Sequence, residues 1–247
     1  MNKISRIHPV LEAIRSSPKK INKILLQKDL KKQSFQEILS IANKENIPVV
    51  FTPRNKMDQQ ARRHQGIIAL VAPKKYTPLD TIMDSASLPF LLLLDQIEDP
   101  QNLGAIVRTA EGAGVDGIIL PERRSAGLTS AVFEVSSGAL VHVPVSRVKN
   151  LARTMDELRK REVWLIGAEQ GSPKLWYEFD YTVPVGIVMG SEAKGLRRII
   201  RKKCDEIRSL PLDGKVGSLN VGSAASVFLY EVVRQRQKKT FEAKKIE

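Results

Sequence analysis

Three short stretches of the sequence place charged and polar side chains among small residues, a composition that suits a ligand site. They are DPQNLGAIVRTAEGAGVDG at 99–117, GSEAKGL at 190–196 and LPLDGKVGSLNVGSAASVFLYEVVRQR at 210–236. The polar side chains that could do chemistry there are Asn102, Arg108, Glu192, Ser218 and Asn220. Amide, carboxylate, hydroxyl and guanidinium groups could together orient a polar substrate, guide a proton and stabilise negative charge that develops during a reaction.

The first stretch contains a literal G-x-G-x-x-G in Gly112, Gly114 and Gly117. A dinucleotide-binding fingerprint must follow a strand and open a helix, so that the helix N-terminus meets the pyrophosphate. Here the glycines close the helical pattern LGAIVRTAEGAG and lead into the apolar run GIIL. This order predicts a helix end and a tight turn and excludes the dinucleotide fingerprint.

The second stretch is similar to a phosphate-binding loop of nucleoside triphosphatases, because two glycines follow the expected strand PVGIVM. Leu196 and Arg197 stand where that loop needs Lys and Ser or Thr, so the phosphate and magnesium contacts have no donors. The loop still follows a buried strand, at the sheet edge where ligands gather in α/β proteins.

Each polar residue also has a purely structural interpretation. Glu192 could be an acid stabilised at a helix start, and Ser218 or Asn220 could cap the next helix. Arg108 and Glu111 have the spacing of a surface ion pair, which contributes little to stability. The residues taken singly leave these interpretations open.

The elements that must position these residues divide the chain into segments. Residues 1–73 alternate helical and strand patterns as a small α/β unit, and the proline-containing stretch 74–89 is a predicted linker. Residues 90–237 form a second α/β series, and 238–247 a basic tail. The expected strands of the second series are FLLLLD, GIIL, VHVPV, VWLIGA, PVGIVMG and EIRSLPL. Continuous apolar strands that alternate with helices predict a mostly parallel sheet covered on both faces.

Charge gives the strongest indication of a partner. Across 247 residues, 40 Lys and Arg against 27 Asp and Glu give a net charge of +13. Such an excess in a folded chain favours a polyanion partner. Aromatic residues make up only 5%, so no stacking platform for single strands is evident.

Other features exclude several classes of protein. The single cysteine, Cys204, allows no internal disulfide, and the three histidines show no ligand spacing, so we expect a cytoplasmic protein without a metal. The first residues lack the apolar core of a signal peptide. The longest apolar run, LPFLLLLD, is too short to span a bilayer, so no membrane association is expected.

Taken together, NLGAIVRTA, VMGSEAKGL and LPLDGKVGSLNVGSAASVFLYE resemble motifs one, two and three of the SPOUT-class RNA ribose 2′-O-methyltransferases. Their order and spacing match the TrmH/RlmB group. The stretches HPVLEAI and HQGIIALVAP resemble the small ribosomal-protein-like RNA-binding domain that precedes the catalytic domain in such enzymes. One departure is Gly222, which stands where the third motif usually has a serine.

The resemblance implies an α/β fold whose C-terminal SPOUT domain is a trefoil knot with a mostly parallel sheet, following a small α/β RNA-binding domain. It implies S-adenosyl-L-methionine as cofactor, held by backbone groups at Gly190, Leu210 and Leu219. It also implies a homodimer, with each active site completed near the subunit interface. No metal is needed.

The resemblance further assigns roles to the polar residues. Arg108 would lie at the ribose hydroxyl, where we expect it to hold a neighbouring phosphate and stabilise alkoxide charge while the phosphate or a water takes the proton. Asn102 would hold the hydroxyl or the loop. Glu192, Ser218 and Asn220 would complete the pocket, and we expect Arg108 to face it.

The implied substrate is 23S ribosomal RNA, with a guanosine as the methylated nucleotide. Two alternatives stay open: transfer RNA as substrate, and a non-catalytic RNA-binding or ribosome-assembly factor. The charge alone supports such a factor equally well. The presence of Arg108, Glu192 and Asn220 together favours the enzyme.

Overall fold

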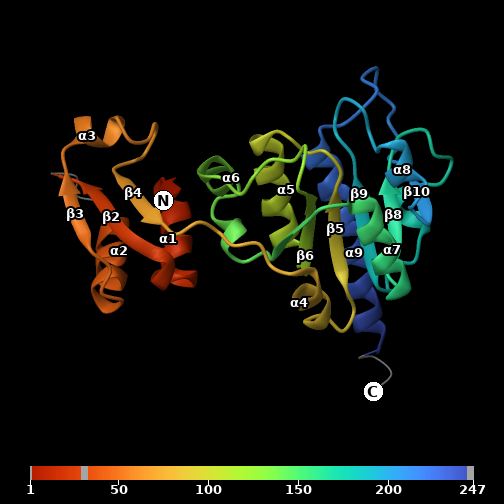
Figure 1. Ribbon diagram of the computed structural model, residues 1–247, viewed down its shortest axis with the longest axis horizontal. Helices are drawn as coiled ribbons and strands as arrows, with labels where there is room; N and C mark the ends of the chain where they lie inside the picture. Colours follow the sequence, from red (N-terminus) through yellow and green to blue (C-terminus); the bar gives the residue numbers. More distant parts are fainter. Residues whose placement is uncertain (1, 29–32, 244–247) are drawn as a thin grey trace. The chain divides into compact units, whose positions relative to one another are not determined.

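The computed structural model describes residues 2–28 and 33–243. By their contacts the residues group into two compact units (Figure 1). The N-terminal unit comprises Met1–Lys75 and Gly127–His142, and the C-terminal unit comprises Tyr76–Ala126 and Val143–Glu247. The domain bounds predicted from the sequence, 1–73 and 90–237, stay predictions. The structure also groups residues 127–142 with the N-terminal unit, which the sequence did not indicate.

A four-stranded mixed sheet forms the centre of the N-terminal unit. Its strands, in spatial order, are β1 (Asn2–Ser5), β4 (Ile67–Val71), β2 (Ile21–Gln27) and β3 (Val49–Thr52). Strand β4 is antiparallel to β1 and β2, and β2 is parallel to β3. Its helices are α1 (Ile7–Ser16), α2 (Gln33–Lys44) and α3 (Arg54–Asp58). The predicted apolar face of α1, Val10, Leu11 and Ile14, is buried, which confirms that helix.

The segment 127–142 packs with the N-terminal unit through α6 (Ser130–Val135) and a 3₁₀ turn at Ala139–Val141. Glu134 accepts a hydrogen bond from the Ser5 hydroxyl, and His142 Nε2 lies 2.6 Å from Glu12 Oε1. The strand expected at VHVPV, residues 141–145, is wrong for all but its last residue, because β7 begins only at Val145. Local apolar pattern alone does not distinguish a tight 3₁₀ turn from a short strand.

The C-terminal unit contains a six-stranded sheet in which every neighbouring pair is parallel. In spatial order the strands are β10 (Glu206–Arg208), β8 (Trp164–Ala168), β9 (Val185–Met189), β5 (Phe90–Leu94), β6 (Gly117–Pro121) and β7 (Val145–Val148). The central strands β9, β5 and β6 are buried along their whole length. The predicted α/β class with a parallel sheet is confirmed, and the trefoil knot stays a prediction.

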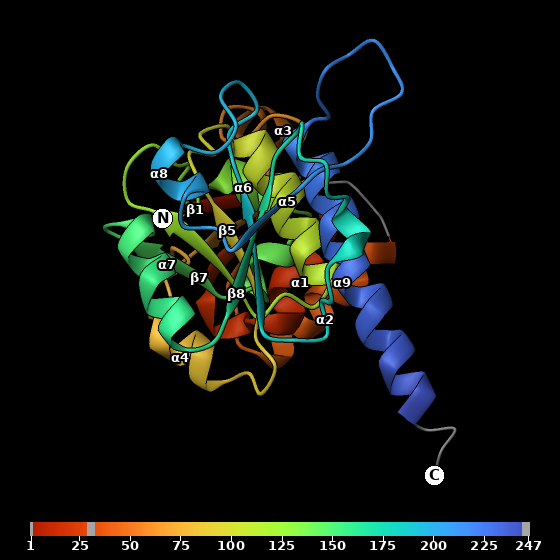
Figure 2. The same cartoon turned by 90° about the vertical axis from the view of Figure 1, so that its right-hand side faces the viewer.

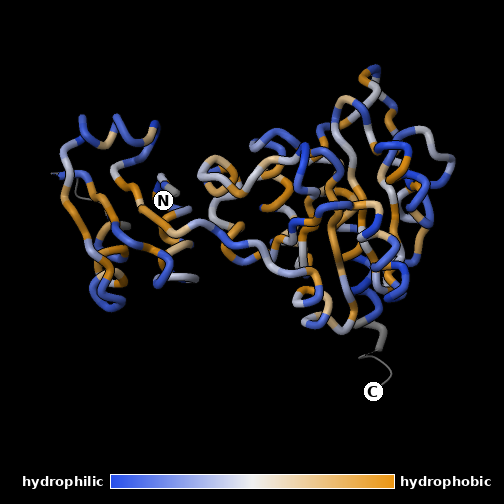
Figure 3. Tube along the Cα trace, viewed as in Figure 1, coloured by the Kyte–Doolittle hydropathy of each residue, from blue (hydrophilic) through white to orange (hydrophobic). Residues whose placement is uncertain are grey.

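Helices cover both faces of this sheet (Figure 2). On one face α4 (Leu79–Asp84), α7 (Leu151–Lys160) and α8 (Arg198–Arg201) bury a shared core with Leu91, Leu93 and Val188. On the other, α5 (Pro100–Gly112) packs against α9 (Val221–Ala243). Figure 3 shows the hydrophobic residues concentrated along the strands between these layers.

Two segments differ from their sequence interpretation. The expected linker 74–89 contains α4, whose Ile82 and Met83 are buried in the core of the C-terminal unit. Helix α9 continues to Ala243, so the expected tail 238–247 begins within a helix. Among the described residues no helix is both long and apolar enough to cross a membrane.

The glycines of the first motif end a helix, as predicted. Helix α5 ends at Gly112, and Gly114 has a left-handed backbone with φ of 71°. A Cβ atom on Gly117, the first residue of β6, would lie 2.5 Å from Ile82. Gly117 therefore allows α4 to pack closely on the sheet.

We predict a pH-dependent stability contribution from Lys74 in the N-terminal unit. Its ammonium donates to Val141 O (2.8 Å), and burial, with a smaller effect of Lys20, lowers its pKa from 10.5 to about 8. Between these values the unfolded chain binds a proton that the folded chain does not, so this group's contribution to stability rises with pH. The unfolding free energy of wild type, relative to Lys74→Met, should therefore rise from about pH 8 to about pH 10.5 in urea titrations. The exposed neighbour Lys75→Met is the control, and a pH-independent difference for Lys74→Met would contradict the prediction.

Candidate functional site

A cluster of hydrogen bonds joins residues from all three motifs at the carboxyl edge of the parallel sheet. Asn220 Nδ2 donates to Asn102 Oδ1 (2.9 Å) and to Glu192 Oε1 (2.5 Å). Asn102 lies in the first turn of α5, Glu192 in the loop after β9, and Asn220 just before α9. The structure thus brings together three of the five polar residues singled out in the sequence.

Asn220 also caps helix α9. Its Oδ1 accepts from the backbone N–H of Gly222 (2.9 Å) and of Ser223 (3.3 Å). The capping interpretation is therefore correct for Asn220, and the same amide joins the motifs through its nitrogen. A cap of this kind contributes about 1 kcal/mol to stability.

Glu192 stabilises the start of helix α9, which is distant in sequence, and not a helix that follows it directly. Its Oε1 accepts from the backbone N–H of Val221 (3.2 Å), the first residue of α9. A carboxylate at a helix N-terminus is favoured by the helix dipole. The Glu192 side chain therefore connects the loop after β9 to the beginning of α9.

Gly222, the departure from the family pattern, lies where α5 and α9 approach each other. A Cβ atom there would be 3.1 Å from Asn220 Oδ1 and 3.3 Å from the Ala105 Cβ. Four residues further along α9, the Ser226 hydroxyl lies 3.2 Å from the Thr109 hydroxyl of α5. Glycine at 222 therefore leaves room for both the cap and the helix contact.

The loop after β9 and the segment before α9 enclose a cavity of about 240 Å³, which we call the inner cavity. Gly190, Leu210 and Leu219 line it, as does Ser218. A Cβ atom on Gly190 would lie 2.2 Å from the carbonyl carbon of Gly195, so only glycine allows the loop to close. The inner cavity thus brings together the three residues to which the resemblance assigns cofactor contacts.

A second cavity of about 420 Å³, the outer cavity, shares Ser191, Glu192 and Val221 with the inner one. Asn102 lines it at the start of α5, and its other charged lining residues are Glu98, Asp99, Arg124 and Lys194. Glu192 therefore stands on the border between the two cavities. A molecule in one cavity could react with a molecule in the other beside this carboxylate.

Arg108 is the predicted site residue that the structure leaves outside both the cluster and the two cavities. It is exposed on α5 and lines neither the inner nor the outer cavity. It makes no ion pair with Glu111 or with any other described residue, so the surface-pair interpretation is wrong. The expectation that Arg108 faces the pocket formed by the second and third motifs is not met in this structure.

An ion pair that the sequence did not suggest holds the loop after β9 in place. Asp95, fully buried directly after β5, accepts from Arg197 Nε (2.8 Å), Arg197 Nη2 (2.7 Å) and the Arg197 backbone N–H (3.1 Å). The backbone N–H of Asp95 donates to Met189 O at the end of β9 (2.8 Å). The sequence feature that could have indicated this ion pair is Asp95 itself, a carboxylate at the end of the longest apolar run of the chain.

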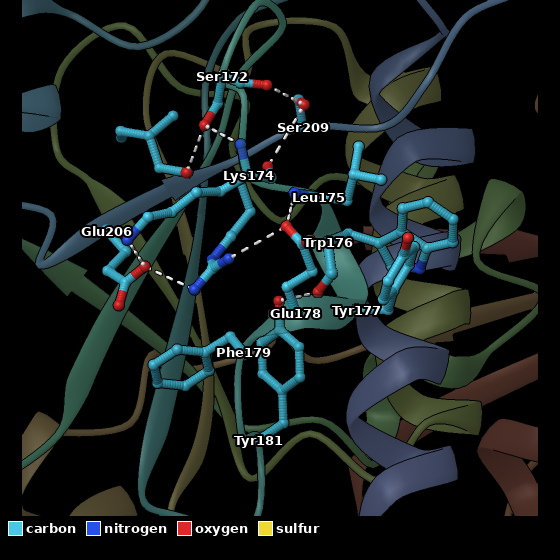
Figure 4. A network of polar contacts seen from close by, with 12 residues as sticks. Ser172, Lys174, Leu175, Trp176, Tyr177, Glu178, Phe179, Tyr181, Glu206 and Ser209 are labelled. Carbon is cyan, nitrogen blue, oxygen red and sulfur yellow. Dashed lines mark hydrogen bonds and ion pairs between the residues drawn. The ribbon is translucent and has the colours of Figure 1, made fainter.

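A polar network surrounds the end of β10, next to the inner-cavity residue Leu210 (Figure 4). The Ser209 hydroxyl donates to Ser172 O (2.7 Å), and the Ser172 hydroxyl donates to Ile207 O (2.8 Å). Arg208, 5% exposed, pairs with Glu206 (2.6 Å) and lies 3.7 Å from Glu178. These contacts join the loop after β8 to the strand end that leads into Leu210.

Burial beneath this network changes the acidity of one aromatic side chain. The Tyr181 hydroxyl donates to Trp176 O (2.6 Å), and burial raises the pKa of Tyr181 above its usual range. Tyr181 is therefore a neutral structural donor. Among the described residues, no group of three or more His, Cys, Asp or Glu is placed to hold a metal ion.

Two family models match the chain. The SpoU rRNA methylase family matches residues 89–230, and a family described as RNA 2′-O ribose methyltransferase substrate binding matches residues 7–77. A Bacillus subtilis protein named as TrmH family tRNA/rRNA methyltransferase YacO is 40% identical over 92% of this chain and 93% of its own length. A Staphylococcus aureus protein with the same family name is 44% identical over 93% and 94%.

Solved structures agree with this grouping. The SpoU methyltransferase AviRb from Streptomyces viridochromogenes superposes with a TM-score of 0.82 at 25% identity, covering 96% of this chain and 90% of its own. The complex of AviRb with AdoMet gives a TM-score of 0.80 at the same identity and coverage. A TrmH/SpoU tRNA modifying enzyme of A. aeolicus, at 26% identity and a TM-score of 0.58, matches 64% of this chain and 81% of its own. The chain belongs to the SpoU/TrmH family of S-adenosylmethionine-dependent RNA methyltransferases.

Proposed function

We propose that this protein transfers a methyl group from S-adenosylmethionine to a ribose 2′-hydroxyl of RNA, with a guanosine of 23S ribosomal RNA as the target. The observation that carries the proposal is the Asn102–Asn220–Glu192 cluster on the border of two adjoining cavities. A transfer reaction needs two sites that meet at one point. The family supplies the reaction class, and the net charge of +13 supports an RNA substrate.

The inner cavity suits an adenosine. Its lining residues include Gly190 and Leu219 together with the apolar residues Met189, Leu210 and Phe228. Gly190 has no side chain, so only its main-chain atoms can contact a molecule in the cavity. Backbone groups can hydrogen-bond a purine edge, while apolar side chains cover its faces.

The outer cavity suits the ribose. A 2′-hydroxyl is a very weak acid at neutral pH, so its proton must leave as the oxygen gains the methyl group. When bound, S-adenosylmethionine supplies a methyl group that is already activated on a sulfonium centre. The proton passes to a neighbouring phosphate of the RNA or to a water. The remaining tasks of the protein are orientation of the hydroxyl, which Asn102 and Glu192 can perform, and stabilisation of the developing charge.

We assign that stabilisation to Arg108 of a second copy of the chain. Arg108 is exposed, has no ion pair among the described residues and lies outside the cavities of its own chain. On the neighbouring helix α9, Val227 and Tyr230 are 38% and 51% exposed. A homodimer formed through this helix pair would cover these apolar side chains and could bring Arg108 to the partner's outer cavity.

We also propose a reducing cytoplasm as the compartment. Cys204 is a free cysteine whose pKa burial raises to about 12, with smaller effects of nearby carboxylates. Such a thiol is neutral and unreactive, as expected for a protein without disulfides.

Gly190→Ala should weaken cofactor binding at least about tenfold, because a methyl group at 190 forces the loop after β9 to move by more than a side-chain adjustment. Isothermal titration calorimetry with S-adenosylmethionine measures the effect. Gly214→Ala is the matched control, since a Cβ atom there meets nothing within 4 Å. Unchanged affinity in folded Gly190→Ala would refute the assignment of the inner cavity to the cofactor.

Arg108→Ala should lower the methylation rate about 10²- to 10³-fold, with cofactor affinity unchanged, because one charge-stabilising donor is lost. Glu192→Ala should also be inactive. If Arg108 acts in the partner's site, mixing the two inactive variants should restore about a quarter of the wild-type rate, since half of the dimers are mixed and each has one intact site. No recovery on mixing would place Arg108 in its own chain's site, and normal turnover of Arg108→Ala would remove it from the mechanism.

The substrate can be identified by methyl transfer from labelled S-adenosylmethionine to unmodified 23S rRNA and to unmodified bulk tRNA. Label should enter 23S rRNA and be recovered as 2′-O-methylguanosine after nuclease digestion. Label in tRNA alone would favour the tRNA alternative. Absence of S-adenosylmethionine binding in calorimetry would favour a non-catalytic RNA-binding or ribosome-assembly factor.

A further inference from the structure

A third cavity, of about 410 Å³, lies at the carboxyl ends of β6 and β7, and we call it the basic cavity. Its charged lining residues are Arg123, Arg124, Lys149 and Arg197. No carboxylate of the described residues lines it. A concave surface with one sign of charge concentrates the field and attracts an anion.

Three of these four cations have no counter-charge. Arg197 is paired with Asp95, whereas Arg123, Arg124 and Lys149 are exposed and make no ion pair with any described residue. The first residues of α7, Leu151 and Ala152, also line the cavity, so the positive end of that helix adds to the field.

The rim of the basic cavity is held by hydrogen bonds. The backbone N–H of Ala126 donates to Ile97 O (2.8 Å), and Arg147 Nη2 donates to Glu122 O (2.8 Å). The loop that carries Arg123 and Arg124 is therefore fixed at both ends. A braced loop presents its cations in one arrangement, which suits recognition more than simple solvation.

The basic cavity adjoins the outer cavity through two shared residues, Gln96 and Arg124. Both are non-glycine residues with left-handed backbone, at φ of 63° and 56°. Such backbone is unfavourable for a residue with a side chain, and it concentrates at functional sites. The two cavities thus meet at a pair of strained positions.

We propose that the basic cavity binds a backbone phosphate of the RNA next to the nucleotide whose ribose occupies the outer cavity. The inference rests on the proposed function, because the neighbouring cavity is assigned to the ribose. Every ribose in an RNA strand is flanked by phosphates, so a cation cluster that borders the ribose site lies within reach of one. Such a contact fixes the register of the strand and carries no base specificity.

The test compares two double variants that remove the same charge. Arg123→Ala/Lys149→Ala removes two unpaired cations of the basic cavity, and Lys160→Ala/Lys202→Ala removes two exposed, unpaired lysines elsewhere on the same unit. Fluorescence anisotropy with a labelled single-stranded oligouridylate of roughly 12 nucleotides measures binding by the full chain as salt is varied.

The cavity variant should bind about tenfold more weakly near 0.1 M salt, and its salt slope should fall by about 0.7, as the loss of one phosphate contact on a single strand predicts. The control variant should stay within about twofold of wild type. Equal losses in both double variants would mean that only net charge matters, and would overturn the proposal. On an RNA that the protein methylates, the cavity variant should raise KM and leave kcat unchanged.

A second arm separates RNA from a free nucleotide. Calorimetry with uridine 5′-monophosphate should show no binding to wild type at concentrations where the oligouridylate is saturating. Tight binding of the mononucleotide that the cavity variant loses would make the cavity a nucleotide site and overturn the RNA assignment. Because anisotropy needs no methyl transfer, its outcome is independent of whether the proposed reaction occurs.

Discussion

The buried carboxylate of Asp95 is the interaction on which the arrangement of the site depends. It lies at the end of β5, and it binds Arg197 through both the guanidinium and the backbone N–H. A carboxylate with no exposure to solvent is tolerated only where its oxygens are paired and hydrogen-bonded, as the Arg197 guanidinium and backbone N–H do here. The pair therefore fixes the loop after β9, which carries Gly190 and Glu192 and forms walls of both main cavities.

From this fixed loop the rest of the site is assembled by short-range contacts. Glu192 reaches the start of α9, Asn220 links Glu192 to α5, and small residues let α5 and α9 approach. The network around Arg208 and Ser209 holds the segment that leads into Leu210, which lines the inner cavity. The cavities are thus bounded by segments far apart in the sequence whose positions depend on one another, which is the condition for a preorganised site.

Much of the fold could be predicted because its signals are local. Strands β5, β6 and β9 are continuous apolar runs, and the glycines after α5 are placed as a helix end requires. What could not be predicted depends on contacts between distant residues: Asp95 with Arg197, Glu192 with the start of α9, and 127–142 with the N-terminal unit. Helix α4 was missed because prolines surround a short amphipathic turn, and the outward position of Arg108 depends on the rotation of α5 about its axis.

The hydrogen-bonding capacity of the Asn220 amide is fully used within the protein. Both hydrogens of its nitrogen are donated, to Asn102 and Glu192, and its oxygen accepts from two consecutive peptide groups, so no donor hydrogen or lone pair is left over. Two polar atoms of the cluster keep unused hydrogen-bonding capacity. They are Nδ2 of Asn102 and Oε2 of Glu192, neither of which is hydrogen-bonded to a described residue. Asn220 consequently acts as a scaffold for the cluster, and in the proposed reaction recognition of the ribose hydroxyl would fall to Asn102 Nδ2 and Glu192 Oε2.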